Sequence, residues 1–207
     1  MAAKGNCFMC GKLAGKIAIK NHILKEHNEG KEDCYLIKAE CGYKRDFWLF
    51  FTVPLNSTLE DIDDFLRNIW CECCYHLSVF SRDRRDIDEE KKISYFTKGD
   101  KLLYEYDFGS TTKIFITFLD MISRPKHHQP VVLLARNEPK VETCACGAPA
   151  EYINAWKGGY FCEDCIESWD EGGFLPLVNS PRCGVCGYCG ENDRWIFEAG
   201  KEFPQNM

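Results

Sequence analysis

The first half of the central chain alternates between strand-like and helix-like patterns of apolar residues. Aromatic and β-branched residues dominate Cys34–Glu40 and Phe47–Val53, which predicts two strands. A capping box at Ser57–Glu60 then predicts a helix over 58–71. One apolar face of this helix is formed by Leu59, Ile62, Phe65, Leu66 and Ile69. A helix with a single apolar stripe packs that stripe on a core.

The second half of the central chain is predicted to be mostly strand. Three further segments have short apolar or alternating patterns that predict strands: Lys101–Asp107, Thr111–Leu119 and Val131–Ala135. Phe108–Ser110 is expected to join the first two as a hairpin. His76–Phe80 is a further candidate strand, and the highly charged segment 81–92 is expected to be a solvated loop.

These patterns divide the 207 residues into three parts. Residues 1–30 form a small N-terminal module, which ends in a polar stretch. Residues 31–140 form the core domain with the strands and the helix. Residues 141–207 are rich in cysteine and glycine and poor in apolar residues, which is typical of a module held by metal.

The chain contains 14 cysteines, and all but Cys34 and Cys41 cluster in pairs and triplets. Its longest apolar run, Trp48–Val53, is far shorter than the roughly 18 residues of a membrane span, and the N-terminus has no apolar segment typical of a secretory signal. We therefore expect a cytoplasmic protein that does not contact a membrane. In a reducing compartment, clustered thiols favour metal binding over disulfides.

The N-terminal module has the ligand spacing of a zinc finger. Cys7, Cys10, His22 and His27 follow the pattern C-x2-C-x11-H-x4-H, one residue short in the central gap. On a helix over Lys16–His27, the two histidines lie slightly more than one turn apart and can face the same ion. About thirty residues cannot bury a sufficient core, so zinc would supply folding energy. The alternative is a free thiol pair beside an amphipathic helix.

The predicted zinc finger is poorly suited to reading a base sequence. The net charge of the chain is −6, but residues 1–31 carry six lysines against two glutamates. If His22 occupies its usual helix position in a DNA-reading finger, the residues at the base-reading positions are Gly15, Ala18 and Asn21. We therefore expect either weak, non-specific nucleic-acid binding through the lysines or docking of Ile17, Ile23 and Leu24 onto protein.

The C-terminal part contains a second four-ligand set. Cys144 and Cys146, followed by Cys162 and Cys165, resemble the two cysteine pairs of a zinc ribbon, with a hairpin between them over Tyr152–Phe161. Residues 138–172 carry eight acidic residues against two lysines, so this part is expected to repel phosphate. Contact with protein, or a purely structural role, is favoured here.

Two further cysteine groups are ambiguous. Cys183, Cys186 and Cys189 are compatible with structural thiols, a third metal with a ligand from elsewhere, or part of an iron–sulfur cluster. The group formed by Cys71, Cys73, Cys74 and His76 at the end of the main helix is interpreted as a buried thiol patch, with metal binding or catalysis as alternatives.

Four phrases carry a family resemblance: LEDIDDFLRNIWCECCYHLSVF (59–80), YEYDFG (104–109), LLARNEP (133–139) and FLPLVNSPRCGVCGYCG (174–190). Together they resemble the plasmid pRiA ORF-three-like family, in its branch with an N-terminal zinc finger and a C-terminal cysteine module. The resemblance implies an α+β fold, with a central mixed β-sheet and packed helices between two zinc modules. It implies no defined reaction. Cys186 is typical of the family pattern, whereas Cys183 and Cys189 depart from it.

The expected function is a zinc-binding, non-enzymatic binding or adaptor protein, with about two zinc ions per chain, that contacts protein or nucleic acid. The alternative is an enzyme with a site near His76 and Asp107. No nucleophile–base pair, metalloprotease motif or phosphate loop supports the alternative. A deep pocket joining His76 to Asp107 would favour the enzyme, and a filled core there would favour the binding protein. The oligomeric state does not follow from the sequence.

Overall fold

The structure, a computed structural model, describes residues 3–169 and 172–191. The last part of the predicted third module, 192–207, lies outside the described residues. Within the described ranges, no helix combines the length and the apolar character that crossing a bilayer requires.

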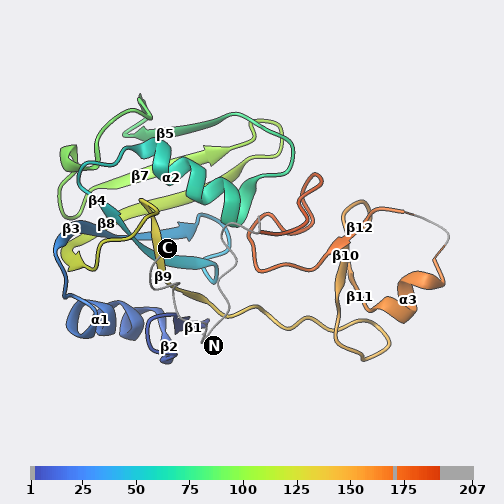
Figure 1. The fold of residues 1–207 in the computed structure, drawn as a ribbon. Coiled ribbons are helices and arrows are strands. Elements are labelled where there is room, and N and C mark those ends of the chain that lie inside the picture. Colours follow the sequence, from blue (N-terminus) through green and yellow to red (C-terminus); the bar gives the residue numbers. More distant parts are fainter. Residues whose placement is uncertain (1–2, 170–171, 192–207) are drawn as a thin grey trace.

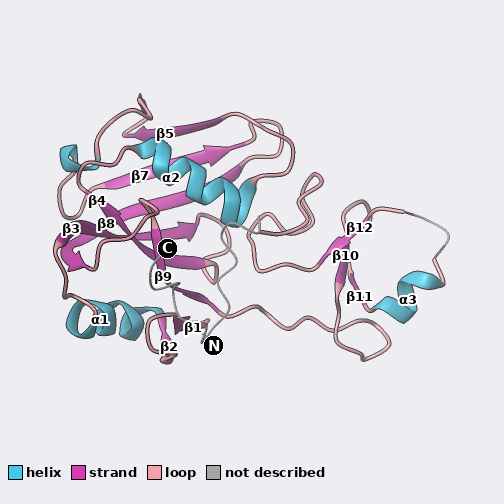
Figure 2. Ribbon diagram, viewed as in Figure 1, coloured by secondary structure: helices cyan, strands magenta, loops and turns pink. Residues whose placement is uncertain are grey.

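A nine-stranded sheet dominates the fold (Figures 1 and 2). Its strands are β1 (Lys4–Cys7), β2 (Leu13–Gly15), β3 (Glu32–Cys41), β4 (Trp48–Pro54), β5 (Ser78–Arg82), β6 (Arg85–Ile87), β7 (Lys101–Tyr106), β8 (Thr112–Arg124) and β9 (Val132–Asn137). Their order across the sheet is β2-β1-β9-β4-β3-β8-β7-β5-β6. The strands of the N-terminal module thus continue the sheet of the core domain.

The central strands bury side chains on both faces, and a helix covers each face. The helix α2 (Leu59–Leu66), extended by a π-helical turn (Arg67–Cys71), packs in one apolar cluster with Leu49 and Phe51 of β4. The intervening residues Trp48 and Phe50 point to the other face, where they cluster with Ile19 and Ile23 of α1 (Lys16–Glu26). The first module therefore covers one face of the sheet.

The close approach of β1 to the sheet depends on a glycine. Gly5 pairs with Asn137 of β9 and lies over the ring of Trp48. A Cβ atom at position 5 would lie 2.2 Å from the carbonyl oxygen of Arg136 and 2.4 Å from the Trp48 ring. Any side chain there would push β1, and the Cys7 that ends it, away from the core.

The expected α+β fold with a mixed sheet and packed helices is wrong. Every strand pair among the described residues is antiparallel, and strands predominate over the few short helices (Figure 2). Helical periodicity is confined to α1 and to 59–71, so few helices are available to pack on the sheet. The pairs β3–β4, β5–β6 and β7–β8 are joined by short connections, which requires antiparallel pairing. The pairs β3–β8, β4–β9 and β1–β9 join strands that are far apart along the chain, and these too are antiparallel.

Two local predictions also need correction. The capping box is shifted by one residue, because it is the amide of Thr58 that donates to a carboxylate oxygen of Asp61, at 3.0 Å. The charged segment 81–92, expected to be a loop, contributes β6, which forms a tight hairpin with β5. The non-glycine residues Asp83 and Arg84 adopt positive φ angles in that turn, a conformation that the charge pattern does not reveal.

The C-terminal module is a small three-stranded sheet that lies beside the large one (Figure 1). It consists of β10 (Tyr152–Asn154), β11 (Tyr160–Phe161) and β12 (Phe174–Pro176), with the five-residue helix α3 (Glu163–Glu167). The rings of Phe161, Trp169 and Phe174 pack edge to face with centroids 5.0–5.9 Å apart. None of the three side chains is fully buried, so this aromatic group is a weak core.

We predict that α1 stabilises the whole sheet. Replacing Ile23, which is fully buried, by alanine should lower the free energy of unfolding by about 2–5 kcal/mol, because it leaves a cavity between α1 and the sheet. Ile17→Ala is the matched control, since Ile17 is 74% exposed on the same helix. It should change stability by less than about 0.5 kcal/mol. Urea unfolding of both zinc-saturated variants measures the difference, and equal effects would refute the docking of α1.

Candidate metal centres

The four predicted ligands of the N-terminal module converge. A ligand atom from each of Cys7, Cys10, His22 and His27 lies within 4.8 Å of all the others. The Nε2 atom of His22 lies 3.1 Å from the Sγ atom of Cys10 and 3.1 Å from the Nε2 atom of His27. The amide of Gly11 donates to the carbonyl of Cys7 at 2.7 Å, which closes the turn carrying the two thiols. His22 lies on α1, and His27 is the residue directly after this helix.

The protonation properties of this group favour a bound cation. Burial raises the pKa of the Cys7 thiol to about 11, so this thiolate is costly without a positive partner. Burial also lowers the pKa values of His22 and His27, which keeps both rings neutral and therefore able to ligate. A metal ion would stabilise the thiolate and accept the free lone pairs of the imidazoles.

The four cysteines of the C-terminal ribbon also converge. Cys144, Cys146, Cys162 and Cys165 place their sulfur atoms within 4.8 Å of one another, and the Sγ atoms of Cys146 and Cys162 lie 3.6 Å apart. Each pair lies on a tight turn. The amide of Gly147 donates to the carbonyl oxygen of Cys144 at 2.9 Å, and the amide of Cys165 donates to the carbonyl oxygen of Cys162 at 3.2 Å. This is the geometry expected of two zinc knuckles.

The thiols of the ribbon differ strongly in acidity. Backbone amides of Cys146 and Cys162 donate to the sulfur of Cys144 and lower its pKa to about 6. The Cys165 thiol, hydrogen-bonded to Cys162 and the other sulfurs, has its pKa raised to about 12. Several neighbouring thiolates repel one another, and a divalent cation at their centre removes that repulsion. The donor set is thus suited to a soft metal.

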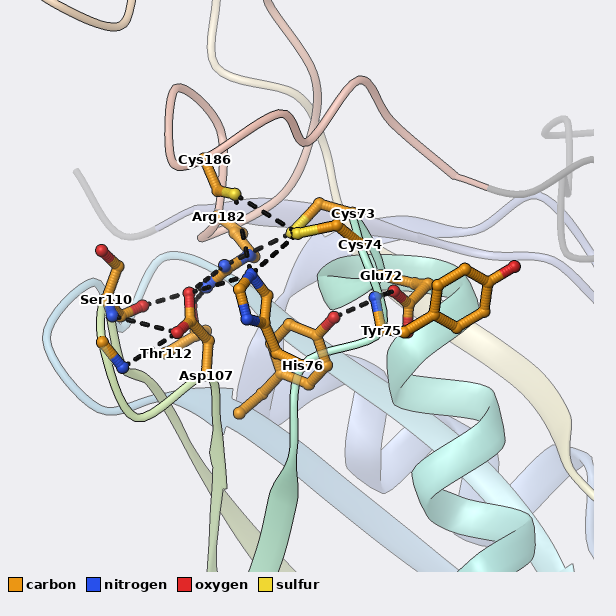
Figure 3. Close-up of polar contacts among 12 residues, drawn as sticks. Glu72, Cys73, Cys74, Tyr75, His76, Asp107, Ser110, Thr112, Arg182 and Cys186 are labelled. Atoms are coloured by element: carbon orange, nitrogen blue, oxygen red, sulfur yellow. Dashed lines mark hydrogen bonds and ion pairs between the residues drawn. The ribbon is translucent and has the colours of Figure 1, made fainter.

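A third group of four ligand atoms lies at the end of α2 and its π-helical turn. It consists of Cys73, Cys74, His76 and, from a segment far along the chain, Cys186 (Figure 3). The interpretation of 71–76 as a buried thiol patch holds only for Cys71, which is fully buried and outside this group. Of the three cysteines left open near the C-terminus, Cys186 joins the group, whereas Cys183 and Cys189 do not.

His76 and Asp107, the residues of the alternative enzyme site, do lie together. The Nε2 atom of His76 is 3.4 Å from a carboxylate oxygen of Asp107. Asp107 is, however, only 4% exposed, and its oxygens accept hydrogen bonds from Arg182 and from the amides of Gly109 and Ser110. Burial alone would raise its pKa, but these hydrogen bonds lower it to about 2. The carboxylate is therefore occupied in holding neighbouring segments.

Two surface cavities of about 360 and 470 Å³ lie elsewhere. The first is lined by Asp88, Glu90, Lys91, Lys92 and Tyr95, and the second lies along β5–β7. Neither includes His76 or Asp107. Neither of these two cavities is therefore the deep pocket joining His76 to Asp107 that would favour an enzyme.

The described residues define an antiparallel-sheet protein with three Cys/His groups that could each hold a metal ion. No protein-family model matches the chain, and no curated protein sequence matches it significantly. Among solved structures, the protein of unknown function MM3350 from Methanosarcina mazei Go1 matches with 23% identity and a TM-score of 0.43. The match covers 51% of this chain and 70% of that protein. The resemblance to the pRiA ORF-three-like family remains a prediction.

We predict that the ribbon needs a bound metal ion to fold. Cys162→Ser should remove one zinc ion per chain and make residues 141–177 sensitive to protease, because the partly exposed aromatic group there cannot hold the module alone. Amide exchange in β3 and β4 should not change. Glu163→Gln, at an exposed neighbouring position, is the control and should keep the metal. An intact, protease-resistant module in metal-free Cys162→Ser would contradict the prediction.

Proposed function

We propose that this chain is a zinc-stabilised binding protein in which two structural zinc ions, one in each terminal module, hold surfaces that contact other proteins. The observation that carries the proposal is the convergence of two complete four-ligand sets, one in each module. Cysteine and histidine donors in tetrahedral groups of four favour zinc. Four protein ligands leave no position for the water that a catalytic zinc requires.

The structure weakens the support for nucleic acid as the partner. The ammonium group of Lys16 is engaged by Glu40 and by the carbonyl of Arg45, and Lys25 is paired with Glu26 at 2.7 Å. Fewer lysines of the N-terminal module are therefore free to neutralise phosphates than its charge indicates. The exposed acidic side chains of α3 disfavour phosphate at the other end.

Apolar side chains on the N-terminal module support a protein partner. Met9, Leu13 and Ile17 are 41%, 48% and 74% exposed. Met9 lies between the two cysteines of the first pair, Leu13 begins β2, and Ile17 lies in the first turn of α1. Ile23, by contrast, is used internally against the sheet. Large exposed apolar side chains on one small module are candidates for contacts with a partner. We name Met9, Leu13 and Ile17 the finger patch.

The proposal predicts that the finger patch retains a partner. In an extract of the host organism, the tagged full chain should retain a protein that Leu13→Asp/Ile17→Asp loses at least tenfold, because a buried carboxylate is costly in an apolar interface. Zinc content should be equal in both forms. Lys12→Ala/Lys20→Ala is the control for electrostatic binding. Quantitative mass spectrometry of the retained material measures the difference.

Nucleic acid gives the opposite pattern. Retention that is lost on nuclease treatment and in Lys12→Ala/Lys20→Ala, and that survives in Leu13→Asp/Ile17→Asp, would replace the protein partner by nucleic acid. Such binding would be salt-dependent and insensitive to sequence, since it would rest on a few lysine–phosphate contacts.

A further inference from the structure

We propose that Cys73, Cys74, His76 and Cys186 bind a third zinc ion, which fastens the C-terminal segment 178–190 to the end of the helix that covers the sheet. The ligands come from two segments that are 110 residues apart at His76 and Cys186. Neither segment has a complete ligand set of its own among its described residues. The site exists only when the two segments are docked.

The separations of the ligand atoms fit a tetrahedral ion. The Sγ atom of Cys74 lies 3.7 Å from that of Cys73 and 3.6 Å from that of Cys186. The Nε2 atom of His76 lies 3.6 Å from the Cys186 sulfur and 3.0 Å from the Cys74 sulfur. With zinc–sulfur bonds of about 2.3 Å, the edge of a tetrahedron is about 3.8 Å. Three thiolates and one imidazole form a common structural zinc set.

A buried arginine lies next to this group and donates a hydrogen bond to one of its sulfur atoms. Three thiolates, one neutral imidazole and Zn²⁺ would carry a net charge of −1, which a neighbouring cation favours. The guanidinium of Arg182, fully buried, donates to the Cys73 sulfur at 3.4 Å and to Asp107 at 2.5 Å (Figure 3). It also donates to the carbonyl of Ser110 at 3.0 Å. Hydrogen bonds from such neighbours orient ligands and stabilise thiolates in metal sites.

The backbone around the group is held in conformations that side chains disfavour. Tyr75, between two ligands, has φ = 61°, and the ligand Cys186 has φ = 55°. The Tyr75 side chain is 92% exposed, so packing does not impose its conformation. The turn instead brings Cys74 and His76 to one side. Strained non-glycine residues cluster at functional sites, and here one of them is itself a ligand.

The docked segment also supplies hydrogen-bond donors to the last carbonyl groups of the helix. The hydroxyl of Ser180 donates to the carbonyl of Trp70 at 2.8 Å, and the hydroxyl of Tyr188 donates to that of Ile69 at 3.0 Å. The last carbonyls of a helix lack partners within it, so these contacts cap α2 and its π-helical turn. Zinc at the neighbouring cysteines would keep the capping segment in place.

Zinc counting on the full-length chain tests the site. Under reducing conditions and after removal of loosely bound metal, the protein should hold about three zinc ions, since three four-ligand groups are present. Cys186→Ser and His76→Gln, one from each segment, should each lower the content to about two. Cys189→Ser is the matched control, because Cys189 is an exposed cysteine of the same segment outside the group, and it should keep about three.

A second measurement separates the fastening role from simple binding. In Cys186→Ser, amide exchange across 178–190 should accelerate at least tenfold, while exchange in β3 stays unchanged. The proposal would be overturned if the wild-type protein held only about two zinc ions and the Cys186→Ser variant held the same number. So would a Cys74–Cys186 disulfide, detected by mass, in the metal-loaded protein. The terminal sites are judged separately, because Cys162→Ser should remove one zinc ion whether or not Cys186 is intact.

Discussion

The structure depends on a sheet whose central strands are apolar on both faces. β4 is buried along its whole length, with Leu49 and Phe51 on one face and Trp48 and Phe50 on the other. Neither face can be left to water, so each needs its own cover. α2 supplies one cover from the core domain, and α1 supplies the other from the N-terminal module. The first metal group is therefore tied to the stability of the whole sheet.

Because α1 covers the sheet, the zinc-finger ligand pattern does not indicate a helix that is free to enter a DNA groove. In a DNA-reading finger, the helix presents its side chains to a groove. Here α1 buries Ile19 and Ile23 against the sheet, and Lys16 is engaged by Glu40. The side of α1 that carries Ile19 and Ile23 is therefore used within the chain, while Ile17, Ala18 and Asn21 stay exposed. The finger patch is the surface that we propose for a protein partner.

One buried ion pair holds the C-terminal segment 178–190 against the core domain. Arg182 and Asp107 connect the C-terminal segment to the turn between β7 and β8, and the same guanidinium contacts Cys73. A buried charge needs a partner and hydrogen bonds. Arg182 has both at the turn between β7 and β8, from Asp107, Ser110 and Thr112. The Asp107 carboxylate beside His76 is therefore occupied by the contacts that hold these segments together.

The sequence by itself determined those features that depend on neighbours along the chain. The paired ligands Cys7/Cys10 and Cys162/Cys165 lie on tight turns. His22 lies on a short helix that His27 directly follows, so spacing alone predicted that these ligands would converge. Apolar periodicity likewise located most strands and α2. The antiparallel order of the sheet, and the covering of its second face by α1, depend on pairings between distant strands that no local pattern encodes. The third group has the same cause: Cys73, Cys74 and His76 meet Cys186 only because Arg182 and Tyr188 dock a distant segment on the end of the helix, and only the tertiary structure decides that contact.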